Sequence, residues 1–155
     1  PLLIGCVLIC LLFDRRQMFS ALAIRGKMQM VWMVLGALIF VGAVYLKEPA
    51  GTVDAYEILH ALITAGFVEE ILFRGLFFSW LDRAGCGRLA YLFSGLAWGA
   101  NYGIRSIVVS GSSTLMAVLP MAVFGIVVGT FAALVYKKSE SIWLVIYLHG
   151  ALCLL

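Results

Sequence analysis

Long apolar stretches, separated by short groups of charged residues, run through the whole chain of 155 residues. Most of these stretches approach or exceed the roughly 20 residues that an α-helix needs to cross the hydrocarbon core of a bilayer. The pattern therefore predicts an all-α polytopic transmembrane bundle of about six spans, the first of which is truncated and ends near Phe13. The other five spans are expected at about residues 28–46, 57–81, 89–110, 114–136 and 141–155.

Local chemistry agrees with these boundaries at the start of the third span. Asp54 and Glu57 have the spacing of a capping box, in which the first side chain satisfies a free backbone amide of the new helix. Pro49 and Gly51 interrupt the preceding segment. We therefore expect a helix to begin directly after Asp54.

Glycines recur at four-residue intervals in the fourth and fifth spans. They are Gly95, Gly99 and Gly103 in the fourth span, and Gly125 and Gly129 in the fifth. Small residues at this spacing allow helices to approach closely within lipid. We interpret both series as packing surfaces.

Composition supports a membrane protein and predicts its orientation. Hydrophobic residues make up 64% of the chain and charged residues only 12%, about half the share in soluble domains. The net charge of +3 comes from Lys and Arg in short loops, which gives no indication of nucleic-acid binding. The most basic loops hold Arg15, Arg16, Arg25 and Lys27; Arg83 and Arg88; and Lys137 and Lys138. By the positive-inside rule these loops are cytoplasmic, and we expect an integral, multi-pass protein of a bacterial plasma membrane.

The four cysteines predict neither a disulfide framework nor a zinc site. Cys6, Cys10, Cys86 and Cys153 form no CxxC pair and have no histidine at metal-ligand spacing. We interpret them as small apolar residues.

Three charged residues lie in the middle of the third span, where the surrounding sequence is apolar. Glu69, Glu70 and Arg74 together would cost on the order of 8–10 kcal/mol in lipid if they were neither paired nor hydrated. They must therefore face the interior of the bundle. Glu70 and Arg74 are four residues apart, a spacing that allows an ion pair on one helix face. Such a pair could be purely structural, but a second adjacent carboxylate is better suited to activating water.

Other polar residues occur at a similar predicted depth. Asn101 and Tyr102 lie near the middle of the fourth span and His149 near the middle of the sixth. Together with the charged residues of the third span they predict a polar pocket in the membrane. His60 lies nine residues before Glu69, toward the opposite end of its span, and we expect it to have no role in this pocket.

The run from Glu69 to Arg74 resembles the EExxxR motif of the CAAX prenyl protease and bacteriocin-processing family, also called CPBP or Abi, of intramembrane proteases. The resemblance extends from about residue 54 to the end, where GIVVGTFAALVYKKSESIWLVIYLHGALCLL resembles the last motif region of the family and supplies His149. It implies N-terminal transmembrane helices over residues 1–53 and a protease core over residues 54–155.

The resemblance implies that a glutamate of the pair and a histidine from an FxxxH motif activate water. It also implies that the last histidine, with an asparagine four residues later, polarises the scissile carbonyl. Two positions depart from this pattern. Tyr102 occupies the position of the first histidine, next to Asn101, and Cys153 occupies that of the asparagine. Because tyrosine is a poor base near neutral pH, we expect a loss of turnover of about 10²–10⁴.

The function that this resemblance implies is an intramembrane endopeptidase of the CAAX-processing type, with Glu69 or Glu70 as base, Arg74 fixing the pair and His149 stabilising the oxyanion. We predict no metal or other cofactor, because two carboxylates and one histidine are a thin ligand set. The expected partners are membrane lipid and a membrane-associated peptide or prenylated protein. The alternative is a catalytically impaired member that acts as a binding, scaffold or bacteriocin-immunity protein. A transporter is disfavoured because the chain lacks inverted repeats.

Overall fold

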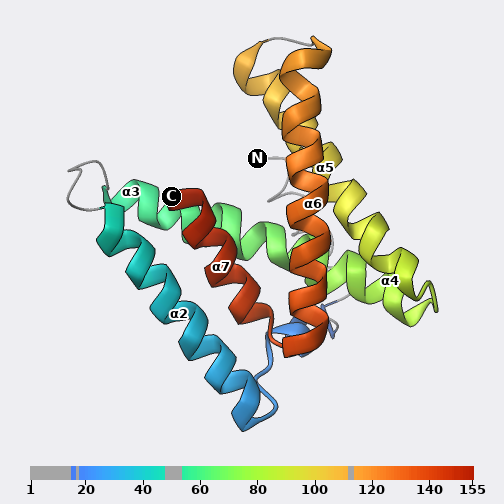
Figure 1. Cartoon of the computed structure of the whole chain (residues 1–155). Coiled ribbons are helices and arrows are strands. Elements are labelled where there is room, and N and C mark those ends of the chain that lie inside the picture. The colour runs from blue at the N-terminus through green and yellow to red at the C-terminus, as the bar shows by residue number, and fades with distance from the viewer. Residues whose placement is uncertain (1–14, 17, 48–53, 112–113) are drawn as a thin grey trace. The chain divides into compact units, whose positions relative to one another are not determined.

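The computed structural model describes residues 15–16, 18–47, 54–111 and 114–155, and every regular element among them is helical (Figure 1). The predicted first span, which ends near Phe13, lies outside the described residues. The elements are α2 (Lys27–Lys47), α3 (Ala55–Leu59), η2 (His60–Glu69), η3 (Ile71–Phe78), α4 (Ser79–Arg83), α5 (Arg88–Ser110), α6 (Leu115–Ser139) and α7 (Ile142–Leu154). The prediction of an all-α chain is confirmed for the described part.

Two of these helices, α2 and α6, are long and apolar enough to cross a membrane by length and composition. The helix α7 is apolar but shorter. The elements from α3 to α4 follow one another without a break, so that residues 55–83 form a continuous helical segment at the position of the predicted third span.

Asp54 starts this segment as expected from its spacing to Glu57. Its backbone is extended, and its side-chain Oδ1 accepts a hydrogen bond of 2.7 Å from the backbone amide of Glu57. This bond satisfies one of the amides that have no partner within the first helical turn. The predicted helix start at Asp54 is confirmed.

Most of the segment is wound as a π-helix rather than an α-helix. The elements η2 and η3 contain 10 and 8 residues, with only Glu70 between them. π-helical turns are rare, usually occur singly, and are frequent at functional sites. Here η2 ends with Glu69, η3 contains Arg74, and Glu70 is the residue between them.

The described residues form two compact units. The first comprises the residues up to Leu76 together with Tyr136–Leu155, and the second comprises Phe77–Val135. This grouping reflects contacts and does not test the predicted domain boundary after residue 53, which stays a prediction.

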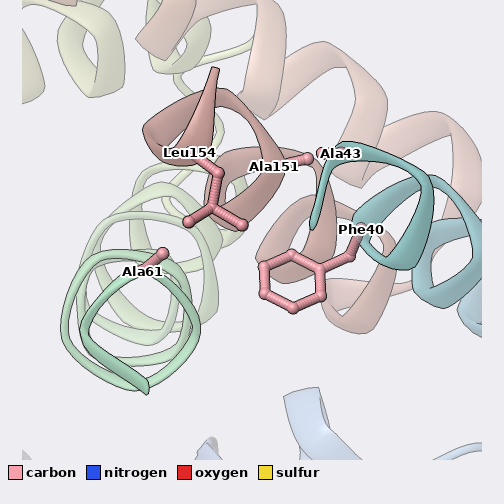
Figure 2. Packing of buried hydrophobic residues seen from close by; sticks show 5 residues of the cluster. All are labelled: Phe40, Ala43, Ala61, Ala151 and Leu154. Carbon is pink, nitrogen blue, oxygen red and sulfur yellow. The ribbon is translucent and has the colours of Figure 1, made fainter. Parts of the chain in front are cut away.

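In the first unit, α2 and η2 pack against α7 around a small apolar core. Its buried residues, drawn in Figure 2, are Phe40, Ala43, Ala61, Ala151 and Leu154. Close approach depends on glycine: a Cβ on Gly36 would lie 3.2 Å from the Cα of Leu144. This packing places α7 beside the helix that carries the charged residues.

In the second unit, α5 and α6 meet through the two glycine series. A Cβ on Gly125 would lie 2.8 Å from the Cα of Gly99, and one on Gly129 would lie 2.9 Å from the ring of Trp98. Real Cβ atoms essentially never come within 3.0 Å of such neighbours. The interpretation of both series as packing surfaces is confirmed.

Candidate active site

Glu70 and Arg74 form an ion pair in the interior of the first unit. Arg74 Nη1 donates to Glu70 Oε1 over 3.1 Å, and both side chains are completely buried. The two residues are four positions apart in and beside η3, so one helix supplies both partners. The charge of each side chain is therefore compensated locally, which an ion inside an apolar environment requires.

His149, on α7, joins this pair from a distant part of the sequence. Its Nδ1 lies 2.9 Å from Glu70 Oε1, and its Nε2 lies 4.0 Å from Glu69 Oε2. Glu69 and His149 are also buried, with 1% and 4% of their surface exposed. The structure thus brings together four of the predicted site residues, Glu69, Glu70, Arg74 and His149, although this does not test their catalytic roles.

Gly66 explains how α7 comes this close. A Cβ at this position would lie 2.7 Å from the backbone oxygen of Ile146, so any larger residue would push α7 away from η2. Gly66 precedes Glu70 by four residues and Ile146 precedes His149 by three. The contact therefore lies about one helical turn from the charged cluster and sets the distance between the carboxylates and the imidazole.

The two carboxylates have different surroundings. Glu70 Oε1 contacts both Arg74 and His149, whereas Glu70 Oε2 is buried and has no hydrogen-bond partner within the described part of the chain. Since a carboxylate can only accept, its contact with Nδ1 requires a proton on that nitrogen. Glu70 therefore fixes the tautomer and orientation of the ring and leaves Nε2 directed to the side of Glu69.

Cys153 is the fifth predicted position that the structure places at this cluster. It lies one turn after His149 on α7, its side chain is close to the imidazole of His149, and the residue is exposed. Cys153 also lines a cavity of about 310 Å³ together with His60 and Lys47. The sequence does not predict this cavity, and His60 lies in its wall rather than in the predicted polar pocket.

Asn101 and Tyr102 are on α5, in the second unit, and their part in the site stays a prediction. The ring of Tyr102 packs edge-on against Trp98, with ring centres 4.9 Å apart, and also contacts Phe124. Asn101 Nδ2 is buried and has no hydrogen-bond partner among the residues that the structure describes. Asn101 thus has a donor that is not used in its own unit.

No group of three or more His, Cys, Asp or Glu side chains within the described ranges is arranged to hold a metal ion. The polar cluster of the first unit is instead a network of two carboxylates, one guanidinium and one imidazole. Networks of this composition can hold a histidine in a defined tautomer and position a base beside it.

The family model for type II CAAX prenyl endopeptidases of the Rce1-like type matches residues 29–155. The chain belongs to this family. The match confirms the resemblance that EExxxR and His149 predicted, and it begins upstream of residue 54, where the predicted resemblance started. Comparison with curated proteins and with solved structures finds no match. Membership of the Rce1-like family makes the chain a membrane protein of a group of CAAX-processing hydrolases.

Proposed function

We propose that this Rce1-like chain is an intramembrane endopeptidase in which Glu69 activates water for attack on a peptide bond. The observation that carries the proposal is the buried arrangement of His149 between the two carboxylates, with Nδ1 2.9 Å from Glu70 and Nε2 4.0 Å from Glu69. A separation of 4.0 Å is too long for a direct hydrogen bond but short enough for a water molecule to contact both groups.

The remaining side chains have supporting roles in this proposal. Arg74 compensates Glu70, and Glu70 accepts from the Nδ1–H of His149 and orients the ring. Glu70 Oε1 contacts both Arg74 and His149, so in this proposal Glu70 orients the ring. We therefore assign the role of general base to Glu69, whose Oε2 faces Nε2 of the same ring.

The proposed reaction is a general-base hydrolysis of a peptide bond. Glu69 takes a proton from water while the water oxygen bonds to the carbonyl carbon, and the carbonyl oxygen becomes an oxyanion. With the ring protonated on both nitrogens, His149 Nε2–H donates to this oxyanion. The C–N bond then breaks, and the proton on Glu69 passes to the leaving amine. The products are a carboxylic acid and an amine, and Glu69 is again ionised.

In this proposal the protein is polytopic and has about six spans in a bacterial plasma membrane. Its substrate is a prenylated protein or a membrane-associated peptide. Two apolar helices and the membership of a CAAX-processing family support this setting. The burial of Glu69, Glu70, Arg74 and His149 also supports it, because ionisable groups that face lipid are costly.

A second candidate function is that of a binding or scaffold protein that uses the same cluster without turnover. It is favoured by the residue at position 102, where the family pattern has a histidine and this chain has a tyrosine packed against Trp98. It is also favoured by Cys153, since a thiol is a weak hydrogen-bond donor.

The experiment that separates the two functions compares wild type with Tyr102→His, alone and combined with Cys153→Asn. Each protein is reconstituted in liposomes with a prenylated reporter ending in a CAAX sequence, and with an unprenylated peptide embedded in the membrane. For a weakened protease, the substitutions should recover part of a deficit of about 10²–10⁴ in the rate of peptide release. Glu69→Gln in the same background should abolish the gain. Reporter binding without cleavage in all variants would favour the scaffold.

A further inference from the structure

A polar cavity lies where α2 ends and the following helical segment begins, and its lining does not include Glu69, Glu70, Arg74 or His149. It has a volume of about 310 Å³, and its wall includes Lys47, Glu57, His60 and Cys153. Its apolar floor includes Leu154, which belongs to the core of the first unit and points toward η2 in Figure 2. All these residues belong to one compact unit. None of the roles proposed for Glu69, Glu70 or Arg74 uses this cavity.

Two opposite charges lie side by side in the wall of this cavity. Lys47 Nζ is 3.7 Å from Glu57 Oε2, and both side chains are partly exposed. An ion pair of this length and exposure is worth no more than about 1 kcal/mol. Glu57 Oε2 is buried as an atom and accepts no hydrogen bond from any residue that the structure describes. Both groups therefore keep the capacity to bind a ligand that carries the complementary charges.

The cavity also lies at the end of α2, where large apolar and aromatic side chains are exposed. Lys47 is the last residue of α2, a helix of membrane-spanning length, and Glu57 is in the first turn of α3. Leu46 and Tyr56 beside the cavity are each 73% exposed. Lysine and tyrosine at the end of a span are typical of the membrane–water interface, where phospholipid headgroups lie.

We propose that this cavity binds the headgroup of a phospholipid that has a phosphodiester and a primary ammonium group. The phosphate lies against Lys47 and the imidazole of His60, and the ammonium donates to Glu57 Oε2. The acyl chains lie along exposed apolar residues such as Leu46. A trimethylated headgroup has no N–H to donate to Glu57, and an anionic headgroup without an amine would face its carboxylate. Both should therefore bind less well.

An occupant of this cavity would also cover Cys153, which is part of its lining. Cys153 is therefore a native probe of occupancy. The test uses a variant in which the other cysteines, Cys6, Cys10 and Cys86, are changed to serine, reconstituted in phosphatidylcholine vesicles with or without phosphatidylethanolamine. The measured quantity is the rate at which a maleimide labels Cys153.

Phosphatidylethanolamine should slow the labelling by about threefold or more, the protection that two-thirds occupancy gives. Glu57→Gln and Lys47→Gln, which keep side-chain size, should each remove most of this protection. Glu140→Gln makes the same substitution at an exposed glutamate and should leave the protection unchanged. A variant that retains only Cys86 controls for general effects of the lipid on the bilayer, and its labelling rate should not depend on phosphatidylethanolamine.

Equal rates of Cys153 labelling in the two kinds of vesicle would overturn the proposal, and so would protection that survives Glu57→Gln. Two soluble compounds, inorganic phosphate and glycerophosphoethanolamine, test whether the ligand is a lipid headgroup or a free soluble molecule. Protection by phosphate alone, or by a peptide with a free carboxylate but not by the lipid, would also contradict a lipid site. None of these measurements depends on peptidase activity, so the proposal can fail independently of the proposed function.

Discussion

At the scale of single residues, the pairing of Arg74 with Glu70 shows how an apolar helix can contain charge. An ion pair with both partners fully buried is seldom a net source of stability, because removing two charges from water costs several kcal/mol per ion. Replacing the pair by apolar residues would be a simpler solution for a helix with only a structural role. We interpret the pair as part of the support for His149, which shares the same carboxylate oxygen.

Removal of only one partner should be strongly destabilising. Arg74→Met leaves Glu70 buried without its guanidinium, and we expect the free energy of unfolding to fall by about 3–5 kcal/mol. Thermal or denaturant unfolding in detergent micelles measures the change. Arg83→Met is the matched control, since Arg83 is exposed and its Nε donates to the backbone oxygen of Ser79 over 3.3 Å. A loss for Arg74→Met no larger than for this control would refute the role of the ion pair.

The sequence alone predicts that the charged residues are buried, but it does not predict the cavity. The cost of charge in lipid predicts that Glu69, Glu70 and Arg74 turn inward, whatever the details of the fold. The cavity is lined by residues of α2, α3, η2 and α7, and no local sequence pattern predicts that these elements meet. Tyr56 and His60 are four residues apart, a spacing that places two side chains on one helix face, and their ring centres lie 6.0 Å apart in the structure.

At the scale of elements, hydropathy predicts where the helices begin and end, but it does not predict whether a helix is of the α or the π type. The described helices begin and end within a few residues of the predicted spans, because charges and turn residues mark the ends of apolar runs. The π-helical winding of η2 and η3 was not predicted. An apolar run has the same composition in either helix, and the periodicity of a fully buried segment carries little information.

The close contact between α5 and α6 gives a prediction at this scale. Gly99→Ala would place a Cβ 2.6 Å from the backbone oxygen of Ala122, an atom that cannot move without shifting the helix. We expect a loss of about 1–3 kcal/mol in stability. Gly103→Ala on the same helix is the control, because its Cβ would make ordinary contacts of 3.4 Å. Unfolding in detergent compares the two, and equal stabilities would mean that α5 and α6 do not pack through Gly99.

At the scale of the whole molecule, the number of spans is harder to predict than the helices themselves. Only α2 and α6, among the described helices, have the length and composition of a membrane span. The helix α5 carries Arg88 and Arg105, and residues 55–83 carry the charged cluster. Charged side chains lower the hydropathy of the helices that hold them, so these helices resemble membrane spans less than α2 and α6 do.

The predicted orientation can be tested with a native probe, Cys86, in the loop between α4 and α5. A variant with Cys86 as its only cysteine should not react with a membrane-impermeant maleimide in intact cells, because this loop is predicted to be cytoplasmic. Permeabilisation should make Cys86 reactive, since the residue is partly exposed. Labelling from outside in intact cells would reverse the predicted topology.

The most direct test of the account is the rate of peptide release by purified protein in liposomes, compared between wild type and Glu69→Gln. If Glu69 activates water beside His149, the substitution should lower the rate by about 10²–10⁴, while the neighbouring ion pair and the stability of the protein stay intact. The control is Glu140→Gln, which changes an exposed carboxylate and should leave the rate unchanged. Full activity of the Glu69→Gln protein would contradict the central claim, because the carboxylate could not then be the base.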